Sequence, residues 1–276
     1  MFAITSVDEL VNTVKKVKAE GKSIGLVPTM GALHEGHLSL IQRARKENDI
    51  VTVSIFVNPV QFNNPEDLQK YPRTPEKDLD FIRAYADYAF MPEAEEVFPE
   101  KPTEEYHFGA VEQVMEGAAR PGHFNGVGII VRRLLDWTCP DRAYFGEKDY
   151  QQIAVIRELV RQCGIGAQIV PCPIVREANG LAMSSRNKRL TAEQFDTAAN
   201  IYRILKASRE QKDVPQIKAF VAQEIANIPE FTLEYFEVAD DRTLQPVQTL
   251  NDAPGIMGFI TVHIGGVRLI DNIRYR

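Results

Sequence analysis

The stretch Ile24-Gly25-Leu26-Val27-Pro28-Thr29-Met30-Gly31-Ala32-Leu33-His34-Glu35-Gly36-His37 decides how the rest of the chain is read. The apolar run at 24–27 predicts a strand. Apolar residues at 38, 40, 41 and 44 recur at helical spacing and predict a helix directly afterwards. His34 therefore falls just before a helix and His37 in its first turn, where two glycines let the backbone approach a ligand closely.

The start of this predicted helix is suited to an anion. A helix N-terminus carries unsatisfied N–H groups and a partial positive charge, and it is a natural site for phosphate. Two imidazoles there, His34 and His37, favour a phosphate ligand. Two other interpretations exist: structural histidines, or a pair of zinc ligands on one helical face. The zinc interpretation is weaker because no cysteine lies nearby and Glu35 faces away from where a metalloprotease base would be.

Composition limits the functional classes. The chain has 276 residues, 44% hydrophobic and 25% charged, with a formal net charge of −6. This is an ordinary globular composition with room for one large domain or two modest ones. A broad nucleic-acid surface is not expected on an acidic chain, so an anionic ligand must meet local positive charge in a pocket.

The cysteines and the apolar segments bear on localisation. Cys139, Cys163 and Cys172 match no zinc or redox spacing, which fits buried thiols in a reducing cytoplasm. The N-terminal residues show no basic region followed by an apolar core, so no signal peptide is expected. No apolar run reaches membrane-spanning length. We therefore expect a cytoplasmic protein with no membrane partner.

A second strand follows the helix at 50–57, where nearly every residue is apolar or β-branched. Strand, crossover helix and strand form a βαβ unit, which predicts an α/β doubly wound parallel sheet. Ligands of such sheets bind beyond the carboxyl ends of the strands. Asn58 and Gln61 lie at this second strand end. Asn58 could serve only as a turn former, whereas Gln61, flanked by apolar residues, is a candidate for reading a small polar substrate.

The middle of the chain adds two features. Residues 120–126 form a glycine-rich turn with two candidate cations, Arg120 and His123, either a wall of the site or a plain surface loop; a helix is expected from about 127 to 137. A further strand at 142–146 leads into a helix that starts with Lys148. A lysine in a first turn opposes the helix dipole, which favours a phosphate contact over a plain surface lysine. Gln152 follows one turn later.

The last third of the chain changes character. A strand is expected at 168–175, followed by Ser184, Ser185 and Arg186, which suit a polyanion but are also typical of a solvated loop. Antiparallel-looking strands then follow at 231–238, 258–264 and 267–270. We expect a first domain at 1–175 and a smaller α+β domain at 176–276 that acts as a lid on the first. His263 alternates within a strand and is expected to be structural.

The ordered set of motifs resembles the pantothenate synthetase (pantoate–β-alanine ligase) family. The segments that carry the likeness run from near residue 24 to residue 272: 26–37, Phe56-Val57-Asn58-Pro59-Val60-Gln61-Phe62, Tyr71-Pro72-Arg73-Thr74, Arg120-Pro121-Gly122-His123-Phe124, Phe145-Gly146-Glu147-Lys148-Asp149-Tyr150-Gln151-Gln152, Met183-Ser184-Ser185-Arg186-Asn187 and Arg268-Leu269-Ile270-Asp271-Asn272. A lone His-x-Gly-His is shared with the wider nucleotidylyltransferase and class I synthetase group; the whole set is far more specific.

The resemblance implies a Rossmann-like first domain, a homodimer, and ATP with Mg²⁺, pantoate and β-alanine as small-molecule partners. Pantoate and ATP would give pantoyl adenylate and pyrophosphate, and β-alanine would then displace AMP. It implies catalytic roles for His34, His37, Lys148, Ser184, Ser185 and Arg186. It implies ATP contacts by Pro28, Met30, Gly31, Ala32, Leu33, His34, Glu35, Gly36, His37, Gly146, Glu147, Lys148, Asp149, Val175, Met183, Ser184, Ser185 and Arg186.

For the other substrates the resemblance implies contacts by Asn58, Gln61, Tyr71, Arg120, His123 and Gln152. No protein ligand is assigned to Mg²⁺, which keeps much of its water and binds through phosphates. Two rival functions share the first domain: a nucleotidylyltransferase, which releases no AMP, and a regulator that binds ATP without turnover.

Overall fold

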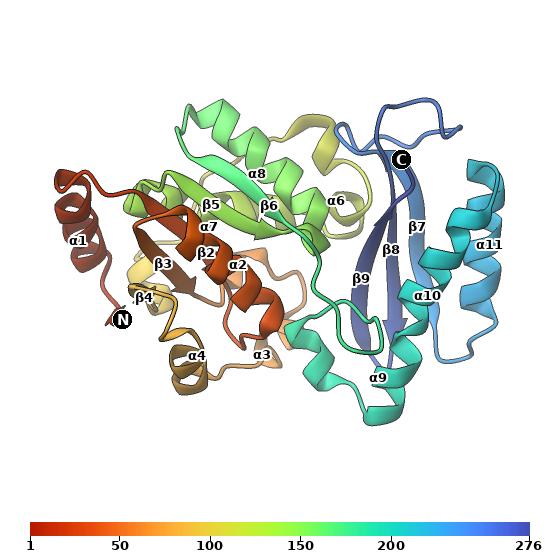
Figure 1. Cartoon of the computed structure of the whole chain (residues 1–276), viewed down its shortest axis with the longest axis horizontal. Coiled ribbons are helices and arrows are strands. Elements are labelled where there is room, and N and C mark those ends of the chain that lie inside the picture. Colours follow the sequence, from red (N-terminus) through yellow and green to blue (C-terminus); the bar gives the residue numbers. More distant parts are fainter. The chain divides into compact units, whose positions relative to one another are not determined.

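The strand predicted around 24–27 lies in the middle of a six-stranded parallel sheet (Figure 1). The computed structural model describes all 276 residues. The strand order is β1-β4-β3-β2-β5-β6, and every neighbouring pair is parallel. The strands are β1 (Phe2–Ile4), β2 (Ile24–Thr29), β3 (Ile50–Ile55), β4 (Tyr88–Phe90), β5 (Arg142–Gly146) and β6 (Gln168–Cys172). The predicted α/β sheet is thus confirmed.

The order of the strands creates a reversal point. From β2 the chain moves to β3 and β4 on one side, whereas β5 and β6 lie on the other side. Ligands of parallel sheets bind at such points, beyond the strands' carboxyl ends. The segment after β2 is the histidine loop, defined here as residues 30–34, and the segment after β5 begins with Glu147.

Helices flank the sheet because their apolar residues recur on one face. In α2 (Glu35–Glu47) the predicted residues Leu40, Ile41 and Ala44 are buried in one core with Val27 of β2 and Val53 of β3. The other helical segments of this region are α1 (Val7–Ala19), η1 (Pro59–Gln61), α3 (Pro65–Gln69), α4 (Pro75–Ile82), α5 (Ala94–Val97), α7 (His123–Thr138), η3 (Glu147–Asp149) and α8 (Tyr150–Cys163).

The chain divides into two units that are not cut at a single point. The first comprises 1–108, 120–147 and 152–173; the second comprises 109–119, 148–151 and 174–276. The second unit therefore includes Lys148 and a segment taken from the middle of the chain. The assignment of substrate binding to 1–175 and of a lid to 176–276 stays a prediction.

The second unit is built on a three-stranded antiparallel sheet, β7 (Thr232–Asp240), β8 (Ile256–Ile264) and β9 (Val267–Arg274), in the order β7-β8-β9. Helices α10 (Asn200–Ala207) and α11 (Val214–Ala226) run beside it (Figure 1). Ile201 and Leu205 of α10 share a core with Ile260 of β8 and Leu269 of β9. Its remaining helical segments are η2 (Gly109–Glu112), α6 (Glu116–Ala119), η4 (Ser185–Arg189), α9 (Ala192–Ala198) and η5 (Ser208–Glu210).

One strand was missed, and two local expectations were wrong. Strand β1 was not expected. Helix α7 begins at His123 instead of near 127. Lys148 lies in the 3₁₀ turn η3, and the helix proper starts at Tyr150. None of the helices combines the length and apolar composition that a bilayer crossing requires.

Candidate active site

The histidine loop turns sharply between β2 and α2. Gly31 and Ala32 both adopt positive φ angles, +81° and +49°, and the second of these is uncommon for a residue with a side chain. His34 caps α2, and its Nδ1 accepts a hydrogen bond from the Gly36 N–H at 3.2 Å. The rings of His34 and His37 lie 4.0 Å apart between centroids. Two imidazoles therefore meet at a helix N-terminus, as predicted.

A buried carboxylate accepts hydrogen bonds from the backbone of this loop. Asp78 is 3% exposed. Its Oδ2 accepts the N–H of Ala32 at 2.9 Å, and its Oδ1 accepts the N–H of Leu33 at 2.8 Å. The hydroxyl of Thr74 donates to Oδ1 at 3.1 Å. This arrangement, which we call the Asp78 clasp, uses both carboxylate oxygens on loop backbone and fixes the strained turn.

A second polar group forms where β3 ends. Asn58 is 1% exposed. It caps η1 by accepting the Val60 N–H, and its Nδ2 donates to Gln61 Oε1 at 3.0 Å and to the Gly126 carbonyl at 3.1 Å. Gln61 Nε2 in turn points to the sulfur of Met30, 3.4 Å away. The first strand-end loop and the second are thus joined through the Gln61 side chain.

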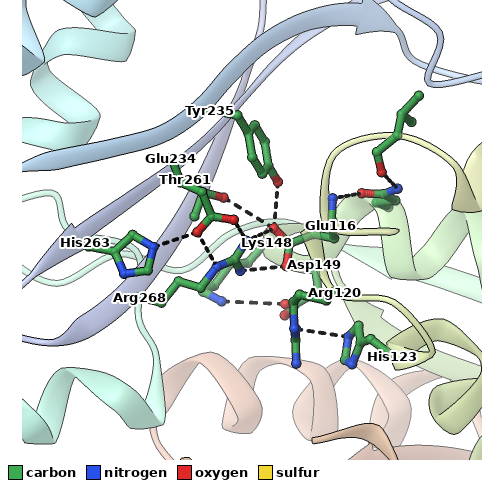
Figure 2. Close-up of polar contacts among 12 residues, drawn as sticks. Glu116, Arg120, His123, Lys148, Asp149, Glu234, Tyr235, Thr261, His263 and Arg268 are labelled. Atoms are coloured by element: carbon green, nitrogen blue, oxygen red, sulfur yellow. Dashed lines mark hydrogen bonds and ion pairs between the residues drawn. The ribbon is translucent and has the colours of Figure 1, made fainter. Parts of the chain in front are cut away.

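His123 sits behind Gln61. Its Nδ1 lies 2.8 Å from the Gln61 carbonyl oxygen, and its Nε2 lies 3.1 Å from Arg120 Nη1 (Figure 2). A guanidinium can only donate, so Nε2 accepts; a carbonyl can only accept, so Nδ1 carries the proton. The geometry assigns His123 as a neutral imidazole that links Arg120 to the Gln61 backbone.

In the second unit, the end of β9 holds the residues that follow β5. Lys148 has a side chain that is 19% exposed, with Nζ 3.6 Å from Asp149 Oδ1. The Asn272 side-chain amide donates to the Lys148 carbonyl at 3.1 Å. Lys148 is therefore fixed through its backbone carbonyl, and its largely buried side chain lies near the Asp149 carboxylate.

The loop that follows β6 has its own supports. Ser184 caps η4 by accepting the Arg186 N–H at 3.2 Å, and Ser185 is 5% exposed. The Met183 N–H donates to the Val175 carbonyl at 3.0 Å, which joins the two predicted ATP segments of this loop.

An ion pair lies beneath that loop. Arg176 pairs with both carboxylate oxygens of Asp271, at 2.7 and 3.0 Å. Burial raises the pKa of Asp271, and the guanidinium of Arg176 opposes the rise.

Comparison with known proteins identifies the family. A family model described as pantoate-beta-alanine ligase matches residues 3–274. A pantothenate synthetase of Bacteroides fragilis is 50% identical over 280 positions, which cover 100% of this chain and 99% of the relative. The chain belongs to the pantoate–β-alanine ligase family.

Solved structures agree with this assignment. Pantothenate synthetase from Thermus thermophilus superposes with a TM-score of 0.93 at 40% identity, covering 100% of this chain and 99% of that one. The pantoate-beta-alanine ligase from Francisella tularensis, solved with beta-gamma ATP and beta-alanine, superposes with a TM-score of 0.82 at 36% identity, covering 100% and 98%. The chain is thus an enzyme of this ligase type, and both the predicted fold and the stated resemblance are confirmed.

Within the first unit of this ligase, the predicted residues are partly gathered. The histidine loop, Asn58, Gln61, His123 and Arg120 form the connected set described above. Tyr71 is buried and meets Phe62 edge-on at 5.8 Å between ring centroids. Gln152 lies half-buried in the first turn of α8.

Sequence reasoning missed the residues whose hydrogen bonds support the loops of the candidate site. Asp78 lies in the charged segment Glu76-Lys77-Asp78, and nothing local indicated that it binds backbone 45 and 46 residues away. Asp271 and Asn272 were part of a family motif, but no role was assigned to them.

A charged network in the second unit was also missed. Arg268 makes two hydrogen bonds to Glu116, both at 2.7 Å, and two to Glu234, at 2.8 and 2.9 Å (Figure 2). Tyr235 donates to Glu116 at 2.6 Å. Burial works against the charge on Arg268, but the two carboxylates outweigh it and raise the pKa of the guanidinium. His263 lies 2.6 Å from Glu234, a contact consistent with its predicted structural role.

No group of three or more His, Cys, Asp or Glu side chains is placed to hold a metal ion. Asp78, the buried acid nearest in sequence to the Tyr-Pro-Arg-Thr motif, has both oxygens engaged with backbone. The binding of Mg²⁺ through nucleotide phosphates and water stays a prediction.

Proposed function

We propose that this ligase makes pantothenate through a pantoyl adenylate. A carboxylate oxygen of pantoate attacks the α-phosphorus of ATP, and the bond from that phosphorus to the bridging oxygen breaks to release pyrophosphate. The amine of β-alanine then attacks the acyl carbon, loses a proton, and expels AMP. The family to which the chain belongs supports this choice of substrates, as do the nucleotide and the beta-alanine bound to the Francisella ligase.

The observation that carries the proposal is the pair of imidazoles at the N-terminus of α2, fixed by the Asp78 clasp. Attack of one anion on another is limited by repulsion and by positioning, so preorganised hydrogen-bond donors are the main requirement. The N–H groups at the start of α2 and the imidazoles of His34 and His37 supply them in a protein of net charge −6.

Further groups extend the nucleotide site in this proposal. Lys148, Ser184, Ser185 and Arg186 act on the phosphates, and Val175 lies by the adenine. Mg²⁺, held by phosphates and water, would neutralise phosphate charge when bound. No side chain is needed as a nucleophile, because the attacking groups belong to the substrates.

The substrate side of the proposal rests on the polar group at the end of β3. The side-chain oxygen of Gln61 accepts a hydrogen bond from Asn58, and the backbone carbonyl of Gln61 accepts one from His123. The rotation of the Gln61 side chain is therefore restricted before any ligand binds. A preorganised amide loses little entropy on binding. Gln61 and Gln152 hold pantoate, and Gln61 also serves β-alanine, with Asn58, Tyr71, Arg120 and His123 around them. We further propose a cytoplasmic homodimer.

The test follows the two half-reactions separately. Purified enzyme is incubated with ATP, Mg²⁺ and labelled pyrophosphate, and label entering ATP is measured with and without pantoate. AMP release is then measured on adding β-alanine. Exchange that depends on pantoate, followed by AMP that depends on β-alanine, supports the proposal.

Other results would point elsewhere. Exchange without β-alanine-dependent AMP would contradict the second half-reaction. Bound ATP with no exchange would favour a regulator, and a product that keeps the nucleotidyl group would favour a nucleotidylyltransferase. His107→Ala is a suitable control because His107 is an exposed histidine of the same unit.

A further inference from the structure

The motif Arg268-Leu269-Ile270-Asp271-Asn272 contains two buried polar residues to which the proposed reaction gives no role. Asp271 is 4% exposed and Asn272 is 5% exposed, side by side on β9. Burying a carboxylate and an amide is unfavourable unless both are hydrogen-bonded. Each therefore needs hydrogen-bond partners, and the identity of those partners indicates what the two residues do.

Asp271 binds the base of the loop that contains Val175 and Met183. It makes a two-point ion pair with Arg176, whose guanidinium also lies over the ring of Tyr202 at 3.6 Å. Arg176 pairs with Ala182 in an antiparallel bridge. Because Arg176 follows Val175 directly and Ala182 precedes Met183 directly, the ion pair fixes both ends of this loop.

Asn272 binds the other nucleotide segment. Its side-chain amide donates to the Lys148 carbonyl, and its backbone N–H donates to Asp271 Oδ1 at 2.8 Å. The two residues are therefore connected to each other, and their side chains bind separate segments. Lys148, Arg176, Asp271 and Asn272 all belong to the second unit.

We propose that Asp271 and Asn272 are positioning residues for ATP, because they hold the Lys148 turn and the 175–183 loop in one register. This rests on the proposed nucleotide roles of Lys148 and Met183–Arg186. The fork of an arginine on a carboxylate fixes direction as well as distance. A buried ion pair is weak evidence for stability, since an apolar pair of similar volume is often as stable. An apolar pair, however, would not fix the orientation of Arg176 and of the loop attached to it.

The experiment compares Asn272→Ala and Asp271→Asn with the control Glu234→Gln. Glu234 lies in the same sheet and pairs with Arg268 and His263. The control therefore weakens ion pairs that involve neither Lys148 nor Arg176. Calorimetry measures the dissociation constant of α,β-methylene ATP, a non-hydrolysable analogue, and urea unfolding measures stability.

Loss of one or two orienting hydrogen bonds should raise the dissociation constant of the analogue about five- to tenfold in Asn272→Ala and in Asp271→Asn. The KM for ATP in the exchange assay should rise by a similar factor, with the KM for β-alanine unchanged. Glu234→Gln should leave both nucleotide values at the wild-type level.

A purely structural role would lower the urea midpoint and leave the dissociation constant of the folded protein unchanged, which would overturn the proposal. An equal rise in the control would also overturn it. If Asp271→Asn does not fold, Asn272→Ala decides alone. Wild-type enzyme without pantoate-dependent exchange would refute the proposed function, whereas the ratio of analogue dissociation constants tests the positioning role separately.

Discussion

Replacing Asp78 by asparagine should loosen the histidine loop and weaken ATP binding. The amide keeps one oxygen, so it accepts one of the two loop N–H groups, and its NH₂ group then faces the other. One hydrogen bond to a charged acceptor contributes about 1.5–3 kcal/mol, and a buried N–H left without an acceptor costs about 1–3 kcal/mol. We expect Asp78→Asn to lower the free energy of unfolding by about 2–4 kcal/mol, a large part of the total of a typical domain.

The loop geometry makes the functional effect larger than the effect on the fold. Gly31 and Ala32 hold positive φ angles of +81° and +49°, and a non-glycine residue in this region is strained by about 1–3 kcal/mol. Without the clasp the turn can relax, which would change the position of the His34 ring at the start of α2. The KM for ATP should therefore rise in the exchange assay even under conditions where the variant is fully folded.

Thr74→Val is the matched control for this experiment. It removes the hydroxyl that donates to Asp78 Oδ1 but leaves both backbone hydrogen bonds in place. The free energy of unfolding of Thr74→Val should fall by about 1 kcal/mol, the value for one ordinary hydrogen bond. Its KM for ATP should be unchanged. Urea unfolding followed by circular dichroism gives the stabilities. A loss below about 0.5 kcal/mol for Asp78→Asn, with wild-type KM, would refute the role of the clasp.

Three further outcomes are expected. His37→Ala should keep the fold and slow pantoate-dependent exchange by about 10²-fold or more, as removal of one preorganised charge stabiliser does; initial rates against His107→Ala check it, and near-normal turnover would remove His37 from the chemistry. Gln61→Ala should raise the KM for pantoate more than the KM for ATP, and equal rises would argue against substrate reading. Burial, with help from Glu47, raises the pKa of Tyr144 to about 12; the folded state thus keeps a proton that the unfolded chain loses above pH 10, so stability should fall as the pH rises from 10 to 12. Urea midpoints across that range, compared with Tyr144→Phe, test this, and an equally steep fall in the variant would assign it to other groups.

The parallel sheet was predictable because its strands are buried on both faces. The sequence of β3 is a nearly continuous run of apolar and β-branched residues, and the helix before it is recognised by the helical spacing of its apolar residues. Strand β1 was missed because three residues are too short to show a period. The histidine pair at the start of α2 was predictable for the same reason as the fold: the pattern changes from strand to helix within ten residues.

The early start of α7 shows how one residue type can mislead. Glycines at 122 and 126 were read as a turn. Gly126 instead lies inside the helix, and a Cβ there would approach the Val60 carbonyl oxygen at 2.6 Å and the Gln61 Cα at 2.7 Å. It allows α7 to pack directly on the backbone of η1. This close contact also brings Asn58 to the Gly126 carbonyl, so the glycine is part of what places Gln61.

The supporting polar residues could not be predicted because the sequence carries no sign of burial for a charge. Asp78, Asp271 and Glu116 occupy positions that suit a solvated surface as well, and their partners lie 46, 95 and 152 residues away. The residues proposed to contact substrate follow strand ends, which the sequence pattern reveals. The residues that hydrogen-bond to them or to their loops are distant in sequence, so only the tertiary structure shows the pairing. The distinction has a consequence for mutagenesis. Replacing a supporting residue should change KM and stability together, whereas replacing a residue proposed to contact substrate should change the rate or the KM at constant stability.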